Sequence, residues 1–283
     1  MKLPFRALGL IILLSIGKCC YGQGKYNDHE APGSELCIYT GFSFYIGDLN
    51  PTGYLRYQDP AAGIGYRYNF NKRFSFRISG MIDKVHANDA DSPDPVQRDR
   101  NLSFYSWIQE LSGQFEFNFL PFRIGSTDMF CPYIFLGMGG FHFNPRAKMN
   151  GHYYDLQPLS TEGEGTAADP GTKRYSLQSA CIPFGMGFKW SVGKYLGIGF
   201  ESGMRKTYTD YLDDVSGVYP DPTKLPSDLS RAFSNRSLSF NPKFNYTGRQ
   251  RGNSATNDWY NYTGIVISIK LPQKPPKCTG VGK

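Results

Sequence analysis

Polar and apolar side chains alternate with a period of two along about eight segments of this chain. The clearest case is residues 104–120, in which one set of alternate positions is mostly apolar or aromatic and the other is mostly polar. Such alternation predicts β-strands with one apolar face and one polar face. The expected strands cover residues 35–46, 62–70, 73–84, 104–120, 131–144, 176–191 and 195–209, followed by an eighth that contains Tyr262 to Ile269.

The connections between these segments alternate between short and long. Those near residues 71, 121 and 193 are short, and those near 47, 85, 145 and 210 are long. Bacterial outer-membrane barrels have this arrangement, with turns in the periplasm and loops outside the cell. We therefore predict an all-β fold, a small transmembrane antiparallel β-barrel of about eight strands with short periplasmic turns and long extracellular loops. A periplasmic β-sandwich is the alternative, although it need not separate short from long connections so consistently.

The polar face of the expected strands carries charges of both signs. These are Arg67, Arg73, Arg77, Glu110, Glu116, Lys189, Glu201 and Lys270. An interior with this composition fits a narrow barrel whose lumen is filled by paired charges rather than by open water. The pattern argues against a wide pore.

The N-terminus indicates export. Lys2 and Arg6 accompany an apolar run from Ala7 to Ile16, which small or weakly polar residues follow, as in a cleaved secretory signal. Cleavage is expected after Gly22. The predicted division is a signal peptide at 1–22, a periplasmic N-terminal segment at 23–34, the outer-membrane barrel at 35–271 and a periplasmic C-terminal tail at 272–283. The expected location is the outer membrane of a Gram-negative bacterium, in contact with its lipid.

Composition supports the barrel and excludes one class of partner. Aromatic residues make up 16% of the chain and glycine occurs 32 times, which suits a closed sheet with aromatic residues at both lipid interfaces. Beyond the signal, no apolar run approaches the roughly 20 residues that a spanning helix needs. The net charge is +7, but the basic residues are scattered and an exported protein meets no nucleic acid, so no nucleic-acid partner is expected.

Candidate chemistry is sparse. The four histidines lack a serine and a third group arranged for catalysis, so we predict no enzyme activity and no cofactor. Asp210, Asp213 and Asp214 could bind calcium through their oxygens, but their spacing does not match the twelve-residue calcium loop. An acidic turn paired with Arg205 or Lys206 at the barrel rim is the preferred interpretation, and no metal site is predicted.

The cysteines offer one candidate disulfide. Cys37 begins the first strand and Cys278 follows the last, and these strands are neighbours in a closed barrel. A bridge would require the two Cβ atoms to come within about 3.5–4.5 Å. Cys131 and Cys181 are expected to be buried free thiols.

Six segments in order resemble the PorG family, outer-membrane proteins of the type IX secretion system of Bacteroidota. They are YIGDLNP (45–51), PYIFLGMGGFHFNP (132–145), LQPLSTEGEG (156–165), IPFGMGFKW (182–190), RKTYTDYLDDVSGVY (205–219) and RGNSATNDWY (251–260). The resemblance spans nearly the whole mature chain. It implies a non-enzymatic barrel associated with a periplasmic ring built from the PorK lipoprotein and PorN.

The resemblance and the predicted topology disagree on one point. The last long connection contains two of the resembling segments, and it is predicted to face away from a periplasmic ring. We therefore formulate the hypothesis that it folds over the barrel mouth as a structural cap, with Arg251 pairing with Asp213 and Asp214. The alternative function is that of a small OmpA- or OmpX-like barrel acting as a channel or surface protein. A lipid hydrolase is disfavoured by the missing triad.

Overall fold

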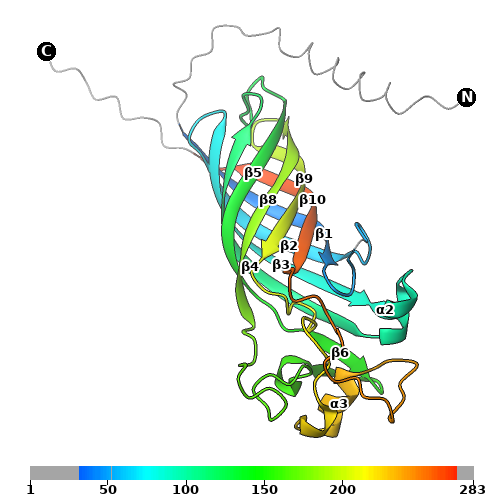
Figure 1. The fold of residues 1–283 in the computed structure, drawn as a ribbon. Helices are drawn as coiled ribbons and strands as arrows, with labels where there is room; N and C mark the ends of the chain where they lie inside the picture. The colour runs from blue at the N-terminus through cyan, green and yellow to red at the C-terminus, as the bar shows by residue number, and fades with distance from the viewer. Residues whose placement is uncertain (1–31, 52, 273–283) are drawn as a thin grey trace, which may run out of the picture. The chain divides into compact units, whose positions relative to one another are not determined.

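Alternating strands form a closed antiparallel barrel in the computed structural model, which describes residues 32–51 and 53–272 (Figure 1). The barrel strands are β1 (Gly33–Ile46), β2 (Asp59–Asn69), β3 (Phe74–Asn88), β4 (Ser103–Asn118), β5 (Phe130–His142), β8 (Gln178–Val192), β9 (Leu196–Thr207) and β10 (Trp259–Lys270). Each strand pairs with its neighbour along the chain, and β1 pairs with both β2 and β10. The eight-stranded closed barrel confirms the predicted fold class.

The two faces of each strand have different chemistry. Outward side chains are apolar and exposed, for example Ile64 (66%), Leu111 (66%) and Met138 (77%), while the lumen side is buried and largely polar. Outer-membrane barrels present an outward apolar band of this kind to lipid. Closure of the barrel also leaves no unpaired strand edge, so every strand can form its backbone hydrogen bonds within the membrane. We call this outward apolar surface the apolar belt.

Several strands extend beyond the bounds that the pattern predicted, β2 and β3 among them. β2 begins at Asp59 instead of residue 62, and β3 extends to Asn88 instead of residue 84. The ladder between β3 and β4 continues as far as the pairing of Asn88 with Ser103. Alternation disappears in the sequence there because Lys84 and His86 replace apolar residues on the outward face, although the backbone stays paired.

The long connections contain short elements that the pattern did not predict. They are a hairpin of β6 (Arg146–Met149) and β7 (His152–Asp155), α2 (Pro95–Arg100), α3 (Asp228–Ser234), and the 3₁₀ turns η1 (Asp89–Asp91), η2 (Gln157–Leu159) and η3 (Pro222–Lys224). Asp94 and Ser227 cap the two α-helices by accepting hydrogen bonds from backbone N–H groups of the first turn. No helix in the described part of the chain has the length and apolar character needed to cross a membrane.

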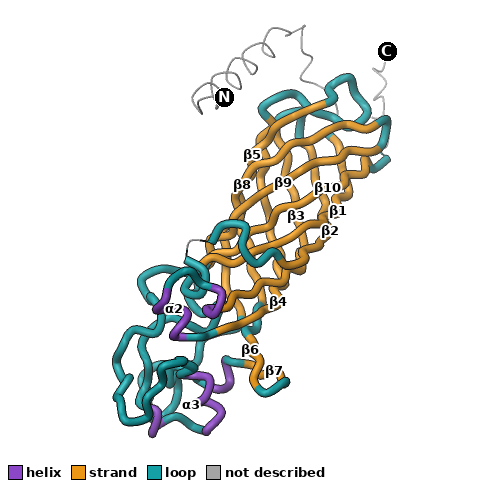
Figure 2. Tube along the Cα trace, turned by 90° about the vertical axis from the view of Figure 1, so that its right-hand side faces the viewer, coloured by secondary structure: helices purple, strands orange, loops and turns teal. Residues whose placement is uncertain are grey.

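The connections divide between the two ends of the barrel (Figure 2). The short-turn end carries residues 70–73, 119–129 and 193–195, and the long-loop end carries residues 47–58, 89–102, 143–177 and 208–258. The largest apolar cluster includes Leu49, Phe104, Phe143, Leu212 and Phe233, so it joins barrel strands to the long connections. The predicted signal peptide and Cys278 lie outside the described residues.

Candidate functional site

Ion pairs fill the middle of the lumen. Glu116 accepts contacts from three cations, at 3.1 Å from Arg67 Nε, 3.0 Å from Arg77 Nη1 and 2.5 Å from Lys189 Nζ. Arg77 also binds Glu201, with Nη2 donating to Oε1 at 2.8 Å. These side chains are at most 7% exposed, so the charges compensate one another in a dry interior.

Further pairs extend the network in both directions. Arg67 Nη1 donates to Glu35 Oε2 at 2.8 Å towards the short-turn end, and Arg205 Nε donates to Glu110 Oε2 at 3.1 Å towards the long-loop end. Two further members of the predicted lumen set lie at the rim instead. Arg73 donates to the carbonyl of Phe119, and Lys270 donates to the carbonyl of Ile124. Both residues are at strand ends, where the backbone carbonyls of the 119–129 connection are within reach.

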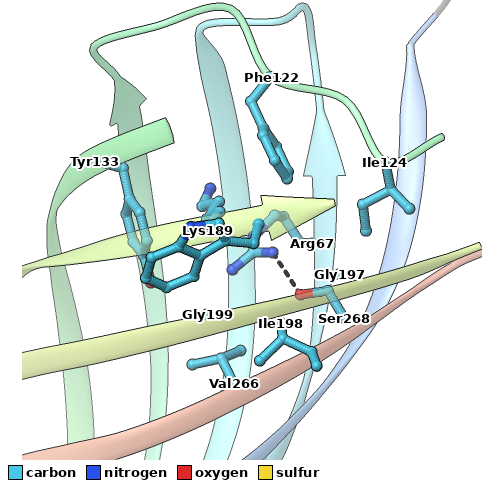
Figure 3. A pocket seen from close by; sticks show the side chains of 11 residues that line it. Arg67, Phe122, Ile124, Tyr133, Lys189, Gly197, Ile198, Gly199, Val266 and Ser268 are labelled. Carbon is cyan, nitrogen blue, oxygen red and sulfur yellow. Dashed lines mark hydrogen bonds between the residues drawn. The ribbon is translucent and has the colours of Figure 1, made fainter. Parts of the chain in front are cut away.

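The connection between β4 and β5 closes the short-turn end. Phe122 and Ile124 are 6% and 1% exposed, and they lie over Arg67 and Lys189 (Figure 3). The space that remains among them is about 10 Å³, roughly enough for one water molecule. Cys131 is a buried thiol in the same apolar cluster, and its Sγ donates to the carbonyl of Leu120.

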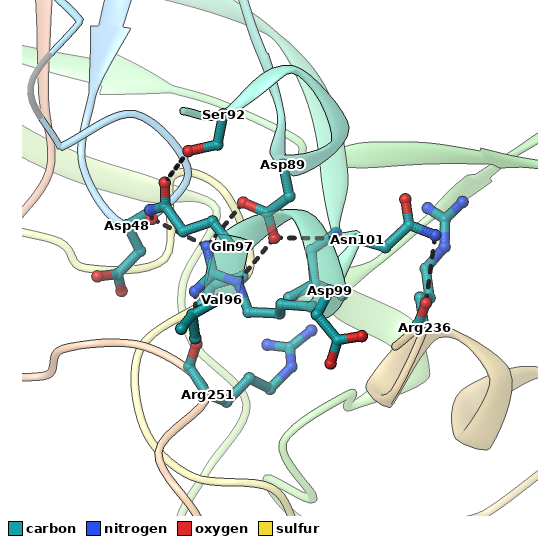
Figure 4. A network of polar contacts seen from close by, with 12 residues as sticks. Asp48, Asp89, Ser92, Val96, Gln97, Asp99, Asn101, Arg236 and Arg251 are labelled. Carbon is teal, nitrogen blue, oxygen red and sulfur yellow. Dashed lines mark hydrogen bonds and ion pairs between the residues drawn. The ribbon is translucent and has the colours of Figure 1, made fainter. Parts of the chain in front are cut away.

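Two arginines join all four long connections at the opposite end. Arg100 binds both oxygens of Asp89, at 2.7 and 2.8 Å, and donates to the backbone carbonyls of Asp48 and Arg251. Figure 4 shows this region, with Asp48, Asp89 and Arg251 labelled. Arg251 donates to Glu162 Oε1 at 2.9 Å and to the backbone carbonyls of Asp214 and Ser234. We call this assembly of the four long connections the loop cap.

The acidic motif of the last connection lies inside the loop cap. Asp214 accepts hydrogen bonds from Thr161 and Tyr175, each at 2.6 Å, and its carboxylate is 3.9 Å from Arg251 Nη2. Asp213 accepts instead from the hydroxyl of Tyr45, at 2.6 Å, and Tyr45 also reaches Asp258 at 2.9 Å. Arg251 therefore contacts Asp214, whereas Tyr45 is the side chain that contacts Asp213.

Arg205 does not pair with the acidic turn as expected. Its guanidinium is 1% exposed, faces the lumen and binds Glu110. The alternation of β9 places Arg205 on the same face as Glu201 and Gly203, which is the lumen face. The prediction that Arg205 lies at the rim was therefore wrong. The neighbouring Lys206 points outward, with its Nζ 5.8 Å from the centre of the Trp259 ring.

Burial changes the acidity of the carboxyl groups in the loop cap. Burial raises the pKa of Asp213 and of Asp258 well above its usual range, and the negative charge of a neighbouring carboxylate adds to the effect. Burial also raises the pKa of Glu164 to about 7 and that of Asp214 to about 6. Both carboxylate oxygens of Glu164 are buried without a hydrogen-bond partner among the described residues.

The sequence interpretation missed several members of this cluster. Arg100, Glu162, Glu164 and Asp258 come from three of the long connections, and no periodic pattern links them. The available signal was the coincidence of charged residues with the resembling segments 156–165 and 251–260. Within residues 32–51 and 53–272, no three side chains of the metal-ligating types lie close enough together to hold an ion.

The candidate disulfide stays a prediction. Cys37 is fully buried on the lumen side of β1, with its Sγ 3.6 Å from Ser268 Oγ, and Cys278 lies outside the described residues. Cys181 is also buried in the lumen, 3.8 Å from the hydroxyl of Tyr260.

The closed barrel, its apolar belt and its ion-paired lumen define the class: this is an outer-membrane β-barrel protein. The chain belongs to the family described as "Domain of unknown function (DUF6089)", whose model matches residues 24–280. No curated protein gives a significant match to the sequence.

Three solved structures are similar to this chain at low sequence identity. Neisserial surface protein A is 7% identical over 86% of this chain and 100% of its own, with a TM-score of 0.43. Ail, the attachment invasion locus protein of Yersinia pestis, crystallised with the heparin analogue sucrose octasulfate, is 10% identical over 86% and 100%, with a TM-score of 0.40. OprG from Pseudomonas aeruginosa is 10% identical over 87% and 100%, with a TM-score of 0.35.

Proposed function

We propose that this protein is a non-enzymatic outer-membrane component of a type IX protein secretion machinery. In this role it anchors or positions a periplasmic ring built from a PorK-like lipoprotein and a PorN-like protein. The observation that carries the proposal is the filled lumen, in which Glu116 binds three cations and Phe122 and Ile124 cover the end. A barrel filled in this way is suited to holding a partner at the membrane rather than to passing solutes.

The six segments that resemble the PorG family support the secretion system as the setting. Four of them supply the loop cap, because Asp48, Glu162, Asp214 and Arg251 each come from a different segment of the six. Segments that resemble a family therefore meet in one buried network, which gives them a shared structural role.

The proposed orientation places the short-turn end in the periplasm, as short turns are placed in outer-membrane barrels. That end exposes Met129 (68%) and Tyr195 (67%), two large apolar side chains on neighbouring turns. Leu271 N donates to the carbonyl of Ser34, so both described ends of the chain also lie there. The short-turn end thus offers a surface for a periplasmic partner.

The alternative is a small barrel that acts as a surface protein. The specific observation in its favour is the loop cap, which presents exposed side chains such as Leu238 (71%) and Val218 (50%) at the end opposite to the short turns. The filled lumen argues against the channel form of this alternative.

The test combines affinity purification with site-specific cross-linking in cells. The full chain carries a tag and a photo-reactive amino acid in place of Tyr195 at the short-turn end, or in place of Leu238 in the loop cap as the matched control. We expect the ring lipoprotein and its partner to co-purify with the tagged protein, and to be cross-linked from position 195 only. Cross-links to the ring from position 238 would refute the orientation. Absence of the ring from complexes that preserve other membrane assemblies would refute the secretion role.

A further inference from the structure

A groove of about 520 Å³ opens on the outer wall of the barrel, where β3 and β4 meet the β6–β7 hairpin. Its lining combines cations with aromatic rings. The principal lining side chains are Lys84, His86, Trp107, Arg146, Lys148 and Tyr153. None of these six side chains takes part in the lumen ion pairs or in the contacts of Arg100 and Arg251 described above.

Strand geometry fixes the height of the groove on the barrel wall. On β3 the outward positions run from Phe74 through Ile78 to Ile82, and the next outward residue is Lys84. Ten residues from 74 to 84, at about 3.3 Å each and tilted by about 40°, rise about 25 Å, which is the height of the apolar band of such barrels. Lys84 therefore lies where acyl chains end and headgroups begin.

The neighbouring strand changes character at the same level. On β4 the outward residue Leu111 is followed towards the long-loop end by Gln109 and then by Trp107, which is 46% exposed. Tryptophan is enriched at the interface between acyl chains and headgroups. The groove thus begins at the edge of the apolar belt and continues into the headgroup layer.

The groove carries a surplus of positive charge. Lys84 Nζ is 3.4 Å from Asp59, which also contacts His86, and Arg146 Nε is 2.5 Å from Asp155. Lys148 is exposed, and its Nζ lies 5.6 Å from the centre of the Tyr153 ring. Within the described chain, Lys148 has no carboxylate within salt-bridge distance. The three permanent cations therefore exceed the two carboxylates, which favours an anionic ligand.

We propose that this groove binds the phosphorylated sugar headgroup of an outer-leaflet glycolipid, given the orientation proposed above. Lys84 and Lys148 donate to a phosphate group, and the Tyr153 ring packs against the sugar. The acyl chains of the same lipid lie along the apolar belt beside Trp107 and Leu111. Continuity between the cationic groove and the apolar belt favours a lipid over a soluble anion, because the lipid can use both surfaces at once.

The test measures lipid binding to the full mature protein folded in detergent, by native mass spectrometry. The probes are diphosphorylated lipid A and the same lipid with its phosphates removed. The double variant Lys84→Gln/Lys148→Gln removes two groove cations. Lys206→Gln is the matched control, because Lys206 is an outward lysine beside a tryptophan at the same end of the barrel, on β9.

We expect the double variant to bind diphosphorylated lipid A about tenfold more weakly, which corresponds to about 1.4 kcal/mol. Lys206→Gln should bind like the unmodified protein, and the dephosphorylated lipid should not distinguish any of the three. Unchanged affinity in the double variant, or an equal loss in Lys206→Gln, would overturn the proposal. Displacement of lipid A by millimolar inorganic phosphate would assign the groove to a soluble anion instead.

Folding of each variant is checked by heat-modifiable mobility on gels. If the double variant does not fold, Lys148→Gln replaces it, because Lys148 contacts only the Tyr153 ring among the interactions of the described residues. A threefold or greater loss of lipid A affinity in that single variant, absent from Lys206→Gln, would support the proposal, and equal affinity would refute it.

Discussion

Glu116 is the residue on which the lumen network depends most. Its carboxylate compensates Arg67, Arg77 and Lys189 at once, and its side chain is fully buried. Removing one partner from a buried ion pair leaves charges without compensation, which costs about 3–5 kcal/mol.

We therefore expect Glu116→Ala to lower the free energy of unfolding by about 3–5 kcal/mol. The measurement is a urea titration of the protein in lipid vesicles, followed by the heat-modifiable gel shift. Asp228→Ala is the control, because Asp228 is an exposed carboxylate paired with Arg231 on α3, and its loss should leave the midpoint unchanged. Equal midpoints for Glu116→Ala and the unmodified protein would show that the lumen pairs contribute nothing to stability.

Arg251 has the corresponding role in the loop cap. Its guanidinium is 3% exposed and joins Glu162 to the backbone of residues 214 and 234. Arg251→Ala should expose the long connections to limited proteolysis at least tenfold faster, while the barrel keeps its gel mobility. Arg249→Ala is the control, since Arg249 lies over the ring of Phe244 outside this network. Identical cleavage rates in the two variants would refute the hypothesis that Arg251 holds the loop cap together.

The buried carboxyl groups predict a pH dependence of the loop cap. The pKa of Glu164 is about 7 in the folded protein against a usual 4.5, and that of Asp214 is about 6 against 3.8. The folded cap therefore binds protons more tightly than the opened cap, and its stability falls as the pH rises from about 4 to about 7.

Hydrogen exchange in the segment 156–165 should accordingly be more protected at pH 5 than at pH 8, after correction for the intrinsic exchange rate. Glu164→Gln should reduce this difference, because an amide does not ionise. Asp221→Asn should leave it unchanged. Hydrogen bonds from Thr223 lower the pKa of Asp221, so this surface carboxylate is ionised at both pH values. Greater protection at pH 8 would show that the sign is wrong.

At the scale of elements, closure depends on the contact between β1 and β10. Gly41 lies opposite Gly264, and a Cβ on Gly264 would come within 2.3 Å of the carbonyl oxygen of Thr40. The two strands can therefore approach only without side chains at this pair. Because β1 and β10 are the first and last strands, their pairing completes the barrel.

We expect Gly264→Ala to lower the stability of the barrel by about 1–3 kcal/mol, the cost of overpacking. The unfolded fraction in a urea titration measures the effect. Gly80→Ala is the matched control, because a Cβ at that outward position of β3 meets no atom within 4 Å. If both variants unfold at the same urea concentration, the pairing of β1 with β10 does not require glycine at position 264.

The eight barrel strands could be predicted because each repeats one physical rule over ten or more residues. The rule fails where the environment changes. The far end of β3 lost its signal at Lys84 and His86, where the outward face carries polar instead of apolar side chains. The hairpin of β6 and β7 has strands of four residues each, too short for alternation to identify.

The loop cap could be predicted only in part, for a different reason. Asp213, Asp214 and Arg251 could be selected as candidates because they belong to segments that resemble the PorG family. Their partners Tyr45, Thr161 and Glu162 come from distant parts of the chain. Which charged groups meet is decided by how four connections of unequal length pack together. The local alternation of polar and apolar residues cannot predict that packing.

For the whole molecule, the two ends of the barrel have different structures and the middle is filled. Phe122 and Ile124 cover the short-turn end, the ion pairs around Glu116 fill the lumen, and the loop cap covers the long-loop end. A solute would have to break buried charge pairs to pass. The filled lumen therefore argues against a channel, which agrees with the proposed anchoring role.

The protein should consequently give no steady current above the lipid background in planar bilayers, at any voltage the bilayer withstands. An open porin inserted under the same conditions is the control for reconstitution, and heat-modifiable mobility shows that the inserted protein is folded. The space beside Arg67 is about 10 Å³, room for roughly one water molecule and too little for a hydrated ion. Stable, voltage-independent conductance of the folded protein would require the lumen network to rearrange in the membrane, and would favour a channel over the anchoring role.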